Sequence, residues 1–268
     1  MTPSNQPSEA ITQELEVRSD GSIEDFWASL DHPNDRYVDR CLAEGKDWRI
    51  RAAFYQRIAA APIRACTYPA RPINGGSLER ALPKTGQWRY EPEYNGWRAL
   101  VHAPSGSMFN RHGERLAIER EFAAALALLK AVQITVGADL VEWFDCEALD
   151  RRHGLGRGTL IVFDFIVPGS QESYVERTAK LAQSLPVHDY TAAPQSERAY
   201  AVVASAPSNL SELEFYRTLK QLNHQWKCPF YEGVLAKRAD SLYPVQLRSP
   251  TLEFAGWMKH RWAGSRAR

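Results

Sequence analysis

The sequence feature that most constrains the fold is the apolar run from Thr159 to Val167. Apart from Asp164, it consists almost wholly of large β-branched, aliphatic and aromatic residues. A run of this length and composition is typical of a strand that is covered on both faces. The chain therefore has to form a sheet and to supply the elements that cover both of its sides.

Strand and helix signals elsewhere predict the rest of an α+β architecture with largely antiparallel sheets. We expect strands at Trp88–Glu91, Arg98–His102, Ser107–Arg111, Leu140–Leu149, Tyr200–Ala204, Glu232–Lys237 and Phe254–Trp262. We expect helices at Glu119–Ala131, Ser173–Leu185 and Asn209–Asn223. The 268 residues, 44% of them hydrophobic, suffice for one good core and a small accessory unit.

The N-terminal region differs in composition from the rest. Residues 1–21 are rich in Ser, Pro, Gln and acids, which predicts a disordered tail. Residues 22–75 are expected to form a small helical extension, and residues 76–268 the main domain, because residues 68–86 read as a loop. The extension has a basic side formed by Arg49, Arg51, Arg57 and Arg64. This side is interpreted either as a DNA contact or as a solvated helix face.

Composition excludes several classes of protein. No apolar run approaches the roughly 18 residues of a membrane span, and the N-terminus has no signal-peptide core, so we expect a cytoplasmic protein without a membrane partner. The net charge of +1 gives no global case for nucleic-acid binding. Scattered cysteines without a Cys-x-x-Cys pair predict reduced thiols, namely Cys41, Cys66, Cys146 and Cys228.

A second constraint comes from the segment Glu93-Tyr94-Asn95-Gly96-Trp97-Arg98. By itself, Asn-Gly between two short strands indicates a hairpin turn. Further segments follow it in order, and they give it a different meaning. They are Phe109-Asn110-Arg111-His112-Gly113, Asp145-Cys146-Glu147, Val162-Phe163-Asp164, Glu232-Gly233-Val234-Leu235-Ala236-Lys237 and Trp257-Met258-Lys259-His260-Arg261.

The last two segments carry the clearest chemistry. The Glu232 carboxylate is a hard oxygen ligand of the kind that magnesium prefers. Lys259 and Arg261 alternate on one strand, so both side chains point the same way and can neutralise a phosphate. A charged strand face is the simpler alternative, but it leaves the Glu-Gly and Trp spacing unexplained.

Taken together, the segments from about Trp88 to Trp262 resemble the adenylation (nucleotidyltransferase) domain of ATP-dependent DNA ligases. The resemblance implies two antiparallel sheets flanked by helices, a fold of the ligase and ATP-grasp kind, with a nucleotide groove between the sheets. It implies ATP or AMP and Mg²⁺ as cofactors and nicked duplex DNA as a partner. RNA ligase-like activity is an alternative, because the shared segments do not identify the polynucleotide.

The same resemblance implies roles for single residues. Glu93 occupies the position of the lysine that attacks the α-phosphate, Lys259 and Arg261 are catalytic positions, and Glu232 is the metal ligand. Glu147 is expected to accept a hydrogen bond from a ribose hydroxyl. Phe163 is expected to stack on adenine, although such a residue also fits a core. The implied nucleotide-binding set is Glu91, Arg98, Arg111, Glu147, Phe163, Lys237 and Lys259.

Two departures from the ligase pattern fall on self-adenylation. A carboxylate at position 93 cannot form the phosphoramidate and repels the triphosphate. The sequence ends at Arg268, where ligases continue into an oligonucleotide-binding domain, so we expect that domain to be missing and a partner protein to close the groove. Lys84, in an upstream loop, is a poor substitute nucleophile because a flexible loop lacks in-line geometry.

Three hypotheses follow. The first is a ligase-type nucleotidyltransferase in which Glu93 blocks one step. The second is a degenerate ligase domain that binds nucleotide or nicked nucleic acid, or seals only ends that are already adenylated. The third is an interaction module in which the charged cleft is a remnant.

Overall fold

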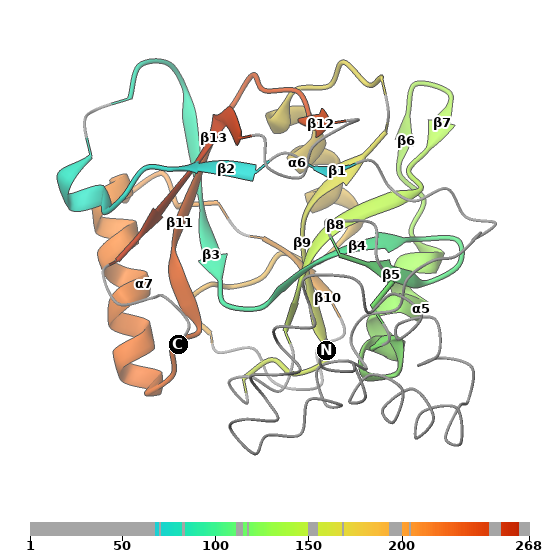
Figure 1. Ribbon diagram of the computed structural model, residues 1–268, viewed down its shortest axis with the longest axis horizontal. Coiled ribbons are helices and arrows are strands. Elements are labelled where there is room, and N and C mark those ends of the chain that lie inside the picture. Colours follow the sequence, from blue (N-terminus) through green and yellow to red (C-terminus); the bar gives the residue numbers. More distant parts are fainter. Residues whose placement is uncertain are drawn as a thin grey trace, which may run out of the picture.

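The computed structural model describes residues 68–69, 71–81, 84–110, 115–116, 118–149, 155–167, 169–192, 200–203, 205–246 and 253–262. The predicted N-terminal tail, the predicted N-terminal helices and Arg111 lie outside these residues. Two sheets face each other, and helices cover them on the outside (Figure 1).

The first sheet contains the apolar run that the sequence marks as a covered strand. Its order is β10 (Tyr200–Val202), β9 (Thr159–Ile166), β8 (Trp143–Leu149), β4 (Trp97–His102) and β5 (Ser107–Phe109). All pairs are antiparallel except β10 with β9. Within β9 only Phe163 is partly exposed, which confirms the prediction of a covered strand.

The second sheet is four-stranded. Its order is β2 (Arg71–Asn74), β13 (Glu253–Arg261), β11 (Tyr231–Arg238) and β3 (Trp88–Tyr94). Here β2 runs parallel to β13 and the other pairs are antiparallel. The prediction of a continuous loop over residues 68–86 was wrong at β2. An edge strand pairs on one side only, so it tolerates the Pro72 that argued against a strand.

Helices cover the outer faces of both sheets (Figure 1). The helix α5 (Ala123–Ala131), continuing the 3₁₀ turn η2 (Glu119–Phe122), packs on the five-stranded sheet, and α7 (Glu212–Trp226) packs on the four-stranded sheet. A third helix, α6 (Tyr174–Ser184), follows β9. Both α6 and α7 begin with a capping box, which satisfies two backbone donors. Shorter elements are β1 (Tyr68–Pro69), η1 (Leu78–Arg80), β6 (Thr135–Val136), β7 (Asp139–Leu140) and β12 (Val245–Gln246).

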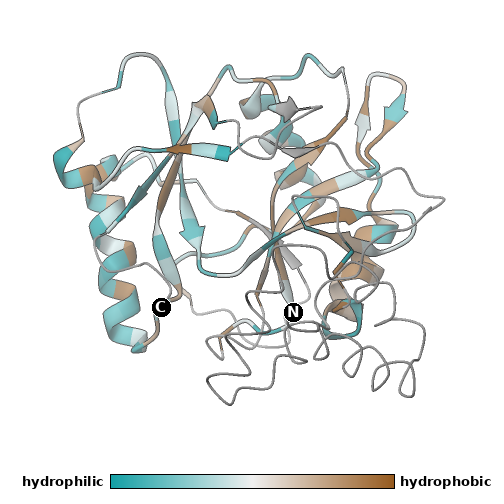
Figure 2. Ribbon diagram, viewed as in Figure 1, coloured by the Kyte–Doolittle hydropathy of each residue, from teal (hydrophilic) through white to brown (hydrophobic). Residues whose placement is uncertain are grey.

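Alternation along the strands separates the core from a polar face. Tyr90, Val234 and Ala236 point from the four-stranded sheet into the apolar cluster with α7. Their neighbours on the same strands point toward the five-stranded sheet, as expected for the two-residue period of a strand. Figure 2 shows the apolar colouring concentrated on β9 and α5.

The fold is therefore α+β, with two largely antiparallel sheets flanked by helices, as predicted, and with one parallel pair at an edge of each sheet. None of the described helices is long and apolar enough to cross a membrane. Among the described cysteines, Cys146 is buried and Cys228 is half-buried.

Candidate functional site

A groove between the two sheets collects most of the residues singled out from the sequence. The groove is lined by eight of these residues, namely Glu91, Glu93, Arg98, Glu147, Phe163, Glu232, Lys259 and Arg261. It is also lined by Arg71, Pro72, Tyr94, Leu235 and Trp257, among others. Glu93 and Arg261, which are 168 positions apart in the chain, thus meet in one site.

One arginine neutralises two carboxylates that line the groove. The Arg261 guanidinium donates to Glu93 Oε1 at 2.9 and 2.5 Å and contacts Glu232 Oε2 at 2.6 Å. Burial disfavours the charged guanidinium, but Glu93 and Glu232 outweigh this effect and raise the pKa of Arg261. The residue at the expected nucleophile position is therefore one half of an ion pair.

Gly233 lies between the two partners of the Glu93–Arg261 ion pair, on the strand β11. Glu93, Gly233 and Arg261 are register partners across β3, β11 and β13, so side chains at the three positions share a face. A Cβ atom added at Gly233 would lie 2.0 Å from the His260 carbonyl oxygen. The glycine lets the strands approach and leaves the space that Arg261 crosses to reach Glu93.

Glu147 closes the groove from the five-stranded sheet. Its Oε1 accepts a hydrogen bond from the Gly96 backbone amide at 3.0 Å. Burial, Glu232 and Glu93 together raise the pKa of Glu147 to about 8, so this carboxyl is mostly protonated at neutral pH. A Cβ added at Gly96 would lie 2.6 Å from the Ala148 carbonyl oxygen, so the turn needs its glycine for close packing against β8.

Arg98 is fixed in place before any ligand binds. It forms a bidentate ion pair with the buried Asp145, at 2.9 and 2.5 Å, and Tyr243 donates to the same carboxylate. Burial opposes the charge, yet Asp145 and Tyr243 raise the pKa of Arg98. Its guanidinium carbon lies 5.6 Å from the centroid of Phe163 and 5.9 Å from that of Trp257. A cation beside an aromatic ring is an arrangement suited to holding a flat base.

Lys237, a member of the implied nucleotide-binding set, is not among the residues that line the groove. Its amine is fully buried, pairs with Glu91 Oε2 at 2.8 Å, and lies 5.2 Å from the Phe163 ring centroid. Tyr174 donates to the other oxygen of Glu91. An amine with no exposed surface cannot reach a phosphate in the groove, so Lys237 supports Phe163 from behind.

Two cations that line the groove form no ion pair with a carboxylate of the described residues. No ion pair or hydrogen bond joins the Lys259 amine or the Arg71 guanidinium to another described side chain. Burial, followed by Arg261, lowers the pKa of Lys259, Glu93 and Glu232 oppose this shift, and Arg71 contributes to it, so the charges of Arg71 and Lys259 are near each other. We call Arg71 and Lys259 the cation pair. Arg71 was not predicted as a site residue, because its strand β2 lies in the predicted loop.

Lys84 lies on the other face of the four-stranded sheet. Its amine contacts His260 Nε2 at 2.7 Å and Tyr90 Oη at 3.3 Å, and His260 alternates on β13 with the groove residues Lys259 and Arg261. Burial and Lys84 lower the pKa of His260 to about 4, so the imidazole is neutral and accepts from the amine. Lys84 is therefore not placed to replace the missing nucleophile.

The groove does not fit the predicted magnesium site. Arg261 pairs with Oε2 of Glu232, the only metal ligand that the sequence suggested. Within the part of the chain that the structure describes, no three His, Cys, Asp or Glu side chains are arranged to hold a metal. No step of the chemistry below is therefore assigned to a metal held by the protein.

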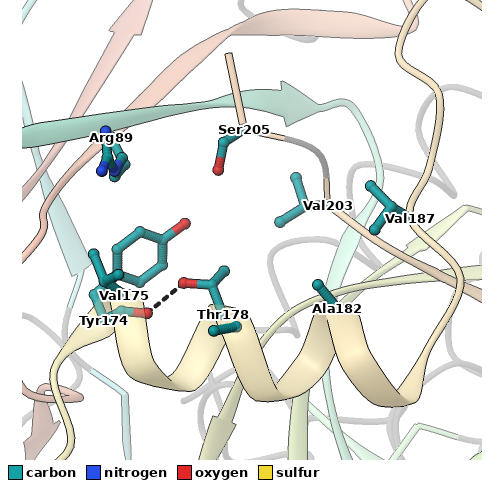
Figure 3. Close-up of a pocket in the computed structure, with 9 residues that line it drawn as sticks. Arg89, Tyr174, Val175, Thr178, Ala182, Val187, Val203 and Ser205 are labelled. Atoms are coloured by element: carbon teal, nitrogen blue, oxygen red, sulfur yellow. Dashed lines mark hydrogen bonds between the residues drawn. The ribbon is translucent and has the colours of Figure 1, made fainter. Parts of the chain in front are cut away.

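A second hollow lies beyond Tyr174 (Figure 3). It follows one side of α6, with Val175, Thr178 and Ala182 pointing into it, and Val203 and Arg89 on its other walls. Thr178 uses its hydroxyl to donate to the Tyr174 carbonyl oxygen. This hollow is mostly apolar and contains none of the residues singled out from the sequence.

Comparisons with known proteins identify similar folds only among solved structures. No family profile matches the chain, and no curated protein matches it. The chain is similar to the ligase domain of LigD from M. tuberculosis, at 21% identity over 73% of this chain and 60% of that chain, with a TM-score of 0.47. It is also similar to Chlorella virus DNA ligase-adenylate, at 13% identity over 72% and 69% of the chains, with a TM-score of 0.44. The chain spans about 60% of the length of the LigD domain. Because these identities and TM-scores are low, the functional assignment rests on the groove and the sequence segments.

Proposed function

We propose that this protein is a ligase-like nucleotidyltransferase domain that holds an adenine nucleotide in the groove but does not adenylate itself. The observation that carries the proposal is the ion pair between Glu93 and Arg261. It occupies the position at which a ligase needs a free lysine amine, while the rest of the groove remains assembled.

The base and ribose end of the groove supports nucleotide binding. Phe163 is the one partly exposed residue of an otherwise buried strand, and Arg98 is held beside it by Asp145. Glu147, with a pKa near 8, can donate or accept a hydrogen bond at neutral pH, which suits a ribose hydroxyl. These groups need no rearrangement to receive a nucleoside, so little affinity is lost to ordering them.

The phosphate end explains why self-adenylation is blocked. A carboxylate is not a nucleophile that yields a phosphoramidate, and Glu93 already shares its charge with Arg261. Sealing of an end that already carries AMP does not require the lysine. In that step a 3′-hydroxyl attacks the adenylated 5′-phosphate, a phosphodiester forms, and AMP leaves.

We infer nicked duplex DNA as the polynucleotide, with RNA as the alternative. A partner protein that closes the open groove belongs to the same proposal. These two assignments rest on the sequence segments between residues 88 and 262, and the groove chemistry serves either nucleic acid.

The decisive experiment compares the protein with its Glu93→Lys variant. Each is incubated with α-labelled ATP and magnesium, and covalent label is detected after denaturing electrophoresis. We expect label only on the variant, because Lys at position 93 would face Glu232 and the groove cations in the nucleophile position. A Glu93→Gln variant is the matched control, since it removes the carboxylate charge without adding an amine.

Label on the unchanged protein would contradict the block at Glu93. Absence of label on both proteins, together with no adenosine or AMP binding by calorimetry, would discard the nucleotide groove and favour the interaction module.

A further inference from the structure

We infer, given the nucleotide groove proposed above, that its phosphate subsite is the cation pair of Arg71 and Lys259 and that it takes a ligand with a single phosphate. The groove would thus prefer a nucleoside monophosphate to a nucleoside triphosphate, and Arg71 would set this preference.

Pairing within the groove decides which charges are available to a ligand. Arg98 is committed to Asp145, and Arg261 is committed to Glu93 and Glu232. Lys237 is buried against Glu91. Of the described cations that line the groove, this leaves Arg71 and Lys259 without a carboxylate partner, on the neighbouring strands β2 and β13.

The number of available charges matches one phosphate. A terminal phosphate monoester carries about two negative charges at neutral pH, and the cation pair offers two positive ones. Arg71 can present two parallel N–H donors to phosphate oxygens, and Lys259 adds a point charge.

A triphosphate would meet repulsion in the same groove. Among the described residues that line the groove, no further unpaired cation is available to its additional phosphates, and the carboxylates of Glu93 and Glu232 line the same groove. Like charges in a partly buried site are screened less than on the surface. Arg261 could contact the extra phosphates only if its ion pairs were broken. The carboxylates of Glu93 and Glu232 would then lose the Arg261 charge.

The test measures binding of adenosine, AMP and ATP by isothermal titration calorimetry, once with EDTA and once with magnesium. We expect AMP to bind about tenfold more tightly than adenosine, as for one charge-assisted contact, and ATP to bind no more tightly than AMP. Arg71→Ala should remove most of the AMP advantage and leave adenosine binding unchanged. Lys259→Met should act in the same direction.

Arg89→Ala is the matched control, because Arg89 is an exposed arginine on β3 outside the groove. It should bind AMP as the unchanged protein does. Tighter binding of ATP than of AMP, with or without magnesium, overturns the inference, and so does an Arg71→Ala variant with full AMP affinity. If the unchanged protein does not bind adenosine, the proposed nucleotide groove itself is refuted. Failure of the proposed function can thus be told apart from failure of the phosphate-subsite inference.

Discussion

The two walls of the groove differ in how their charges are used. On the five-stranded sheet, Arg98 is paired with a buried carboxylate behind it, which leaves the ring of Phe163 and the Glu147 carboxyl directed at the groove. On the four-stranded sheet, Arg261 is paired with Glu93 and Glu232 inside the groove itself. In the first wall the cation is paired with a carboxylate outside the groove. In the second wall the cation is paired with carboxylates that line the groove.

This difference separates binding from chemistry. A wall whose polar groups are fixed from behind can receive a ligand at little cost. A wall whose catalytic positions neutralise one another must break an ion pair before it can act on a phosphate. In the function proposed above, the same fold keeps a nucleotide-binding surface while the Glu93–Arg261 ion pair blocks the reactive step.

The largest effect is expected from the pair that supports Phe163. Lys237→Met leaves the fully buried Glu91 without its cation, which typically costs about 3–5 kcal/mol of unfolding free energy. Urea denaturation followed by circular dichroism measures this. The double variant Glu91→Gln/Lys237→Met should recover much of the loss, because it removes both charges. A single variant that loses less than about 1 kcal/mol would mean that the pair does not brace this wall.

A smaller effect is expected at Phe163 itself. Phe163→Ala should weaken adenosine and AMP binding to the same degree, by about 1–3 kcal/mol, as for the loss of a stacking ring. Phe163→Tyr keeps the ring and should retain affinity. Calorimetry with both ligands is the measurement, and a loss confined to AMP would show that the ring does not contact the base.

The smallest effect concerns the pH dependence of stability. The pKa of Glu147 rises from 4.5 to about 8 on folding, so between these values the folded protein holds a proton that the unfolded chain releases. The contribution of Glu147 to the free energy of unfolding is therefore fully present below about pH 4.5. It is lost as the pH rises toward 8. The expected slope is below about 1.4 kcal/mol per pH unit, because water reaches this half-buried group. Denaturation at several pH values should show a flatter profile for Glu147→Gln, and an unchanged profile would reject the shift.

The sequence predicted the parts of the molecule that depend on local pattern. The apolar run became β9, the segment around Glu93 ended at a turn against β8, and the alternation of Lys259 and Arg261 placed both on the groove face. The helices at Ser173–Leu185 and Asn209–Asn223 were also predicted, although α7 begins at Glu212, after its N-cap Ser211.

Features that depend on pairing between distant strands could not be predicted. The contact of Glu93 with Arg261 requires the register that places Gly233 between them, and sequence spacing does not determine register. Lys237 belongs to the implied nucleotide-binding set, yet its amine is fully buried and pairs with Glu91 on the neighbouring strand β3. Arg71 was missed because four residues with a proline give no strand signal unless the neighbouring strand is known.

The groove and the second hollow share a wall that is one side chain thick. Val203 lines both, and Tyr174 borders the hollow while its hydroxyl donates to Glu91 on the groove side. Substitutions on the two sides of this wall will therefore not be independent. A double-mutant cycle that joins Tyr174→Phe to a groove substitution such as Glu91→Gln should show a coupling energy of about 0.5–3 kcal/mol, as for residues in direct contact. Any map of the groove by single substitutions needs such cycles before its energies are added.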